Sequence, residues 1–139
     1  MQKINSFRGN YFFLSNFYES PVEYNGLTYK NVESAFQAQK TLSEAERIPF
    51  TNMSGTEAKR AGRRVTLRKD WESVKVSIMK DIVTAKFTQN LSLKNALLQT
   101  AGFYLEEGNA WRDYFWGTVN GVGQNHLGKI LMEVRDELS

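Results

Sequence analysis

Two stretches of the chain carry apolar residues at the three- and four-residue spacing of amphipathic helices, and they decide its fold class. The longer stretch follows Asp70 and reaches Phe87, and the other runs from Leu127 to Leu138. Asn125 precedes the second stretch as its predicted cap. The chain must therefore pack mainly helices against one another.

Shorter elements are predicted in the first half of the chain and between the two long helices. The Asn25-Gly26 pair is typical of a type I′ turn, so we expect residues 22–29 to form a β-hairpin. Asn31 is a predicted helix cap, and residues 54–57 have the spacing of a capping box. The shorter helices predicted in this way cover residues 31–40, 54–62 and 92–98.

No internal repeat, low-complexity segment or Pro- and Gly-rich linker divides the sequence. We therefore expect one domain over residues 1–139. Its predicted class is α+β: compact, mainly helical, with a small N-terminal β-hairpin. Residues 102–124 are rich in Gly and Trp and show little periodicity, and irregular segments of this length are often functional.

The absence of cysteine and the single histidine exclude several kinds of catalytic and metal site. The chain has no Cys and one His, His126. A disulfide framework, a thiolate zinc site, a cysteine nucleophile and a multi-histidine metal site are therefore excluded. No apolar run approaches the ~20 residues that span a bilayer, and the N-terminus lacks the apolar core of a secretory signal. We expect a cytoplasmic protein.

Glu33, Gln37 and Lys40 follow the spacing i, i+4 and i+7, which places them on one face of the predicted helix. A carboxylate, a carboxamide and an amine would form a polar stripe beside the apolar face. This stripe is a candidate for acid–base chemistry. A solvated helix face with a weak ion-pair pattern is the alternative.

Residues 59–69 hold six cations and no acid. Guanidinium groups match phosphate oxygens bidentately, so this cluster is a candidate anion site. A nucleic-acid contact and a solvated surface turn are the alternatives. The arginines of the cluster are Arg60, Arg63, Arg64 and Arg68.

The segment from Trp111 to Asn125 places aromatic residues beside glycines. Trp116 next to Gly117 suits a flat heteroaromatic ring, because the ring stacks while the glycine backbone comes close. Asp113 is a candidate to act on a sugar hydroxyl or a developing cation. The free N–H groups of the following helix terminus are expected to receive an anion. Core or lid positions are the alternative for the tryptophans.

At these same residues the sequence resembles the YbiA/NADAR family over nearly its whole length. Ser34 stands where many relatives have histidine, so that ring is dispensable here or was never catalytic. The motifs that carry the resemblance are residues 13–17 (FLSNF), 32–40 (VESAFQAQK), 58–63 with 67–71, and 116–117 with 123–128 and 131–135.

The resemblance implies a compact, mainly helical α+β fold and hydrolysis of a ribosyl C1–N bond. Relatives act on ribosylamino intermediates of riboflavin synthesis, and others remove ADP-ribose from guanine bases. The expected partner is therefore a small phosphorylated N-riboside, such as a ribosylamino-pyrimidine phosphate, or an ADP-ribosylated guanine. Nucleic acid is expected only as a modified substrate, and no membrane partner is expected.

The resemblance also implies roles for individual residues. Glu33 matches the catalytic glutamate, and Lys40 matches the lysine that attacks C1, with a water activated by Glu33 as the alternative nucleophile. Asp113 completes the expected catalytic set. Neither the ligand set nor the chemistry calls for a metal or an organic cofactor. The expected substrate-binding residues are Asn16, Phe17, Gln37, Trp71, Trp116, Gly117, Asn125, Arg60, Arg63, Arg64 and Arg68.

A non-catalytic module that binds a nucleotide or nucleic acid through residues 59–69 is the alternative function. It predicts tight binding with a steep salt dependence and no product. The net charge is only +3, and most aromatic residues lie far from this segment in the sequence. The enzyme is therefore the favoured interpretation.

Overall fold

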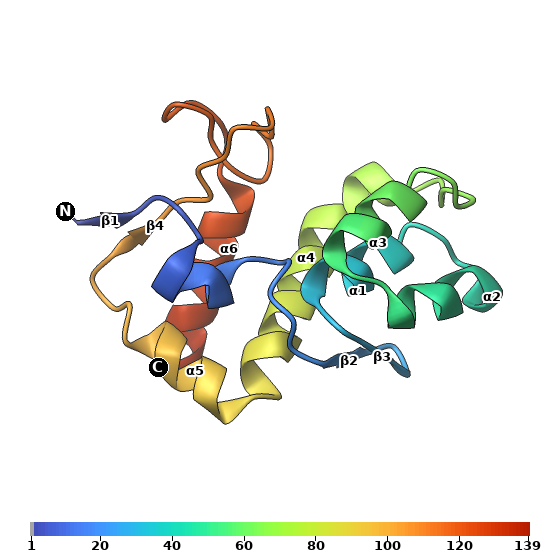
Figure 1. Ribbon diagram of the computed structural model, residues 1–139, viewed down its shortest axis with the longest axis horizontal. Helices are drawn as coiled ribbons and strands as arrows, with labels where there is room; N and C mark the ends of the chain where they lie inside the picture. The colour runs from blue at the N-terminus through green and yellow to red at the C-terminus, as the bar shows by residue number, and fades with distance from the viewer. Residues whose placement is uncertain (1) are drawn as a thin grey trace. The chain divides into compact units, whose positions relative to one another are not determined.

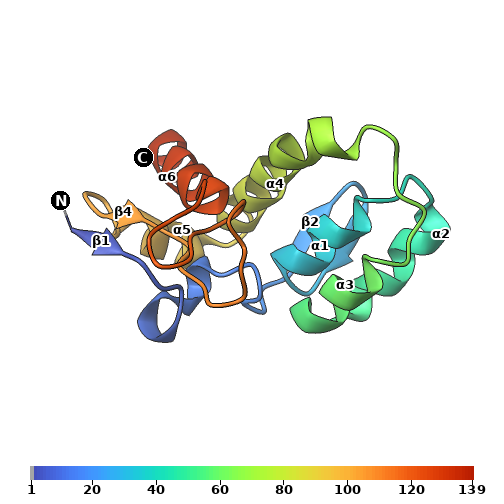
Figure 2. The ribbon, with the colours of Figure 1, turned by 90° about the horizontal axis from the view of Figure 1, so that it is seen from above.

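The computed structural model describes residues 2–139, which form two compact units. One unit is Asn16–Gln89, and the other joins Asn90–Ser139 to the N-terminal segment that ends at Ser15. Helices are the main regular elements of both units, which also contain two small sheets (Figure 1, Figure 2). The expected mainly helical α+β class is confirmed, whereas the expectation of one domain stays a prediction.

The unit Asn16–Gln89 is built around a short helix, α1. In both views α1 lies beside α3 (Figure 1, Figure 2). It also contacts α4, the 3-10 helix η2 and both strands of the hairpin. The elements of this unit are β2 (Val22–Tyr24), β3 (Leu27–Tyr29), α1 (Val32–Ala38), α2 (Glu44–Arg47), η2 (Ile48–Asn52), α3 (Gly55–Ala61) and α4 (Trp71–Thr88).

The predicted hairpin is present as the antiparallel pair β2 and β3, in which Val22 faces Tyr29. Asn25 and Gly26 form its turn with φ of 51° and 86°. Two successive positive φ angles define a type I′ turn, which Asn-Gly adopts at the least steric cost. The expectation is confirmed.

Helix starts in this unit follow their capping residues. The Asn31 side chain accepts the N–H of Ser34 at 2.8 Å and opens α1. Ser54 and Glu57 form both bonds of the capping box and open α3. These caps are confirmed, although α1 ends at Ala38, two residues earlier than expected.

The core of the unit comes from the apolar sides of α1 and α4. Burial of such side chains removes apolar area from water, at roughly 25 cal/mol per Å². Polar residues of α1 are buried in the same place, which the hydrophobic pattern did not predict. The buried apolar side chains of the two helices are Val32, Ala35, Phe36, Ala38, Trp71, Met79, Ile82, Val83 and Phe87.

The second unit packs α6 against α5 and a parallel strand pair. Lys3 of β1 lies opposite Tyr104 of β4. The guanidinium of Arg135, on α6, donates to the carbonyls of Thr100 and Phe103 at 2.8 and 2.9 Å and fixes the chain after α5. The elements are β1 (Lys3–Ile4), the 3-10 helix η1 (Gly9–Leu14), α5 (Leu91–Leu98), β4 (Tyr104–Leu105) and α6 (His126–Leu138).

Candidate functional site

Glu33 and Gln37 lie on α1 and are buried, with 8% and 6% of their surfaces exposed. All seven residues of the helix are buried, because α3, α4, η2 and the hairpin surround it. The interpretation of this stripe as a solvated face is therefore wrong. A buried carboxylate needs hydrogen-bond donors, and Gln37 is one: its Nε2 donates to Oε2 of Glu33 at 2.6 Å.

Lys40 lies in the turn directly after α1 and is half-buried. This partial burial lowers the pKa of the Lys40 amine from its ordinary value. The positive charges of Arg63 and Lys75 lower the pKa further, and the negative charges of Glu33 and Glu72 oppose them. A lysine acts as a nucleophile only when neutral, so the surroundings of Lys40 raise the reactive fraction of its amine.

Asn16 and Phe17 hold the start of this unit against α1 and α3. The backbone carbonyl of Asn16 accepts the N–H of Glu33 at 3.0 Å, which fixes the first turn of α1. The Asn16 side chain lies 3.5 Å from the sulfur of Met79. The ring of Phe17 packs so closely on Gly55 that a Cβ there would overlap it. Asn16 therefore supports the helix that carries Glu33, whereas Phe17 packs on α3.

Trp71 is a core residue, with 5% of its surface exposed. Its ring packs on Phe36 of α1, with 5.0 Å between the ring centroids and 50° between the planes. This contact is the packing role that large aromatic residues usually have. Contact of Trp71 with substrate stays a prediction.

The predicted basic cluster separates into two kinds of arginine. Arg60, Arg63 and Arg64 are exposed. Arg68 binds Asp70 bidentately, with Nε–Oδ1 and Nη2–Oδ2 distances of 2.6 and 3.0 Å. Asp70 therefore makes no side-chain cap bond to α4. Anion binding by the three exposed arginines stays a prediction, whereas Arg68 already binds a carboxylate.

In the second unit, Asp113 organises the irregular segment. Its Oδ1 accepts the N–H groups of Phe115 and Trp116 at 3.1 and 2.9 Å. Asn109, which the sequence did not single out, accepts the N–H groups of Trp111 and Asp113 at 3.2 and 3.0 Å. These are Asx-type turns, which hold a loop without regular secondary structure. A catalytic role for Asp113 stays a prediction.

The first two amides of α6 are not free to bind an anion, so the expectation of free amides there is wrong for these two groups. The N–H of His126 donates to the carbonyl of Phe115 at 3.1 Å. The N–H of Leu127 donates to the carbonyl of Trp116 at 2.9 Å. The preceding loop thus satisfies two of the N–H groups that a helix start leaves without intrahelical partners.

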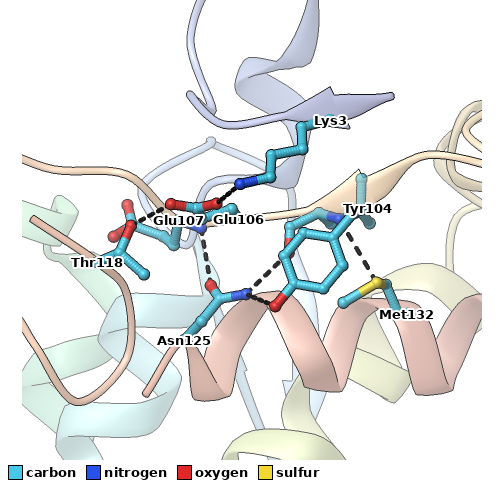
Figure 3. Close-up of polar contacts among 8 residues, drawn as sticks. Lys3, Tyr104, Glu106, Glu107, Thr118, Asn125 and Met132 are labelled. Carbon is cyan, nitrogen blue, oxygen red and sulfur yellow. Dashed lines mark hydrogen bonds and ion pairs between the residues drawn. The ribbon is translucent and has the colours of Figure 1, made fainter. Parts of the chain in front are cut away.

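Asn125 has φ of 52° and forms no side-chain cap bond, so its predicted capping role is also wrong. Its amide instead joins the start of α6 to β4 (Figure 3). Oδ1 accepts the N–H of Glu107 at 2.9 Å, while Nδ2 donates to the carbonyl of Leu105 at 3.0 Å and to the Tyr104 hydroxyl at 3.3 Å. Contact of Asn125 with substrate stays a prediction.

Glu106 is a buried carboxylate that the sequence analysis missed. It accepts the Thr118 hydroxyl and lies 3.3 Å from the Lys3 amine (Figure 3). Gly117, next to this bond, packs on the carbonyl of Glu107, where a Cβ would overlap. Glu106 and the adjacent Glu107 belong to no periodic sequence pattern, so only the fold reveals this contact.

His126 packs its ring on Phe115, with 4.4 Å between centroids, and its Nε2 lies 2.8 Å from Oε1 of Gln124.

Within residues 2–139, no group of three or more His, Cys, Asp or Glu side chains is arranged to hold a metal ion. Over the same residues, no helix combines the length and the apolar character needed to cross a membrane.

The unit Asn16–Gln89 thus brings Glu33, Gln37 and Lys40 together, with the Arg63 charge acting on Lys40. Gly62 is the site residue that sequence reasoning did not find, because it was interpreted only as the end of α3. A Cβ on this residue would overlap Oε1 of Gln37. The second unit separately brings Asp113, Trp116, Gly117 and Asn125 into one hydrogen-bonded loop.

Comparison with known proteins relates the whole chain to one group. A family model described as the NADAR domain matches residues 5–139. N-glycosidase YbiA of Shigella flexneri is 42% identical over 129 residues, which are 90% of this chain and 80% of that protein. A riboflavin biosynthesis protein of Vibrio vulnificus is 36% identical over 135 residues, 93% of this chain and 36% of that protein. The NMR structure of YbiA from E. coli superimposes with a TM-score of 0.85 at 40% identity, covering 99% of this chain and 86% of that one.

Proposed function

The chain belongs to the NADAR family, and from its site we propose that it is an N-glycosidase that hydrolyses the ribosyl C1–N bond of a phosphorylated N-riboside. The observation that carries the proposal is the buried Glu33 carboxylate beside a lysine whose pKa is lowered. The names of the relatives, N-glycosidase and riboflavin biosynthesis protein, agree with this reaction class.

Glu33 acts on the charge that develops at C1. As the bond to the base nitrogen breaks, the ribose gains oxocarbenium character, and a fixed carboxylate stabilises that cation. A carboxylate in this place also transfers the proton that the departing base requires. Its burial strengthens both effects, because little water screens the charge.

Lys40 is the proposed nucleophile. Its neutral amine attacks C1, the C1–N bond to the base breaks, and the base leaves with a proton delivered through Glu33. The ring oxygen then leaves C1 as a hydroxyl, and the Lys40 nitrogen and C1 form an imine. Water hydrolyses the imine, which releases the free sugar phosphate and restores the amine. The lowered pKa of Lys40 supports this route over direct attack by water.

The remaining predicted contacts complete the proposal. Arg60, Arg63 and Arg64 are exposed and bind the phosphate of the substrate. Trp116 and Asp113 belong to the other unit, and their contacts with the base and with a ribose hydroxyl stay predictions from the resemblance. Since Arg68 is bound to Asp70, it contributes to phosphate binding only indirectly.

The proposed substrate is a ribosylamino-pyrimidine phosphate of riboflavin synthesis, which the riboflavin biosynthesis name of one relative favours. An ADP-ribosylated guanine shares the phosphorylated ribose and the N-linked base, so the same assay covers it. The binding-module alternative does not account for a carboxylate buried beside a lysine of lowered pKa, and it predicts no product.

A product assay tests the proposal. Purified protein is incubated with the ribosylamino-pyrimidine phosphate and, separately, with ADP-ribosylated guanosine. We expect release of ribose 5-phosphate from the first and loss of release in Glu33→Gln. The exposed Glu44→Gln serves as matched control and should keep full activity. Release of ADP-ribose alone would identify ADP-ribosylated guanine as the substrate class. No release from either compound would contradict the proposed reaction.

A further inference from the structure

The Gln37 amide is held between a carboxylate and a glycine. Its Nε2 donates to Glu33 at 2.6 Å. Its Oε1 is buried without a hydrogen-bond partner among residues 2–139 and faces Gly62. The orientation of the amide follows from its partner: an ionised carboxylate only accepts hydrogen bonds, so the NH₂ end of the amide must face Glu33.

Stability alone does not explain a glutamine in this place. A buried acceptor without a partner is unfavourable, and native proteins contain few of them. A leucine of similar volume would fill the same space without the unpartnered oxygen. Gln37 is therefore placed for the bond that its other end makes, the one to Glu33.

Gly62 provides the space for this arrangement. Its φ of −60° and ψ of −18° suit any residue, so glycine is not required by the backbone. A Cβ at this position would overlap Oε1 of Gln37 and lie 2.9 Å from its Cδ. The nearest backbone atom, the Ala58 oxygen, would be farther away, at 3.3 Å. An alanine at residue 62 would therefore displace mainly the flexible end of Gln37.

We propose that Gln37 is a positioning residue that fixes the Glu33 carboxylate for the reaction, and that Gly62 is required because it leaves room for the Gln37 amide. The inference rests on the proposed role of Glu33. Gln37 binds one oxygen of this carboxylate and so restricts the rotation of the group. Catalytic groups lose much of their effect when they are misplaced by a fraction of an ångström to 1 Å.

A double-mutant cycle tests the proposal, with Gly62→Ala, Gln37→Ala and the double variant. Loss of a hydrogen bond to a charged group predicts that Gln37→Ala lowers kcat by about tenfold to a hundredfold with KM changed less than about twofold. Gly62→Ala should lower kcat to a similar extent, because it moves Gln37 away from Glu33. In the Gln37→Ala background, where the clash is absent, Gly62→Ala should lower kcat by no more than about twofold.

Two outcomes of the double-mutant cycle would overturn the proposal: a wild-type kcat in Gly62→Ala, or the same loss from Gly62→Ala in both backgrounds. Far-ultraviolet circular dichroism and thermal unfolding check that each variant folds. If Gly62→Ala does not fold, Gln37→Leu replaces it, since leucine keeps the volume and removes the donor. Full kcat in Gln37→Leu would equally contradict a positioning role.

A measurement without substrate separates this inference from the proposed function. The side-chain amide protons of Gln37 should show the NMR shift of a strong hydrogen bond in wild type and lose it in Gly62→Ala and in Glu33→Leu. An unchanged Gln37 amide signal in Gly62→Ala would overturn the structural part. A fully active Glu33→Gln would refute the proposed function itself, whereas an inactive Glu33→Gln with an additive cycle would refute only the role of Gln37.

Discussion

Lys86 on α4 offers a test of burial energetics that is independent of catalysis. Its side chain is 1% exposed, and its amine lies 5.6 and 5.0 Å from the ring centroids of Tyr18 and Phe87. Burial lowers the pKa of Lys86 from 10.5 to about 7. The perturbation is Lys86→Met, which keeps a long flexible side chain and removes the ionisable group.

The sign of the pH effect follows from where the proton is bound. Below pH 7 the folded and unfolded chains both hold the Lys86 proton, and folding carries the full cost of the buried cation. Between pH 7 and 10.5 the unfolded chain holds a proton that the folded chain has lost, so this contribution makes the protein more stable as pH rises. From pH 6 to pH 9 the gain covers about two pH units, or about 3 kcal/mol at 1.36 kcal/mol per unit.

Urea unfolding of wild type and Lys86→Met at pH 6 and pH 9 measures the effect. The difference in free energy of unfolding between the two proteins should shift by about 3 kcal/mol in favour of wild type from pH 6 to pH 9. This shift does not depend on how well methionine packs, because packing contributes equally at both pH values. The exposed Lys129→Met should show no shift. An equal difference for Lys86→Met at both pH values would refute a depressed Lys86 pKa.

Three further predictions concern the two units separately. Arg63→Gln removes a positive charge that lowers the pKa of Lys40, so the increase of kcat/KM with pH that follows deprotonation of Lys40 should move to higher pH. Arg60→Gln is the control and should leave this increase at the same pH. The same pH profile in Arg63→Gln and wild type would contradict the electrostatic account. Asp113→Ala removes the acceptor of two backbone N–H groups and should lower the free energy of unfolding by about 1–3 kcal/mol, with Asp113→Asn closer to wild type. Asn125→Ala breaks two hydrogen bonds to β4 and one to the Glu107 amide, and it should cost about 3 kcal/mol in urea unfolding. A loss below ~1 kcal/mol would show that these bonds contribute little.

Local sequence patterns predicted the elements that depend on local physics. Asn25-Gly26 forms the type I′ turn, and Asn31 and Ser54 cap their helices. Each of these features needs only residues within three positions of one another. The helix bounds were correct to within about two residues for the same reason.

The burial of the site was not predictable in this way. The periodicity of α1 suggested one apolar and one polar face, but neighbouring elements cover both, so Glu33 and Gln37 lie inside. The close approach of Gly62 to Gln37 joins two helices and leaves no local pattern. Predicting such contacts requires the packing of α1 against α3.

The predicted Asn125 cap and the predicted free amides at the start of α6 were wrong for a related reason. A helix start with an Asn before it usually has a side-chain cap and free amides. Here the loop folds back, and its carbonyls accept the N–H groups of His126 and Leu127. Asn125 is then used to bind β4, some twenty residues earlier in the chain. Only tertiary structure determines which of these competing partners is chosen.

The central claim is that Lys40 reacts at C1 of an N-riboside beside Glu33. Reductive trapping tests it most directly: the protein turns over the ribosylamino-pyrimidine phosphate in the presence of borohydride, and peptide mass spectrometry locates any reduced sugar phosphate. The account predicts an adduct on Lys40, absent from Lys40→Met and from wild type without substrate. Product release in the same reaction without an adduct on Lys40 would contradict the proposed covalent route.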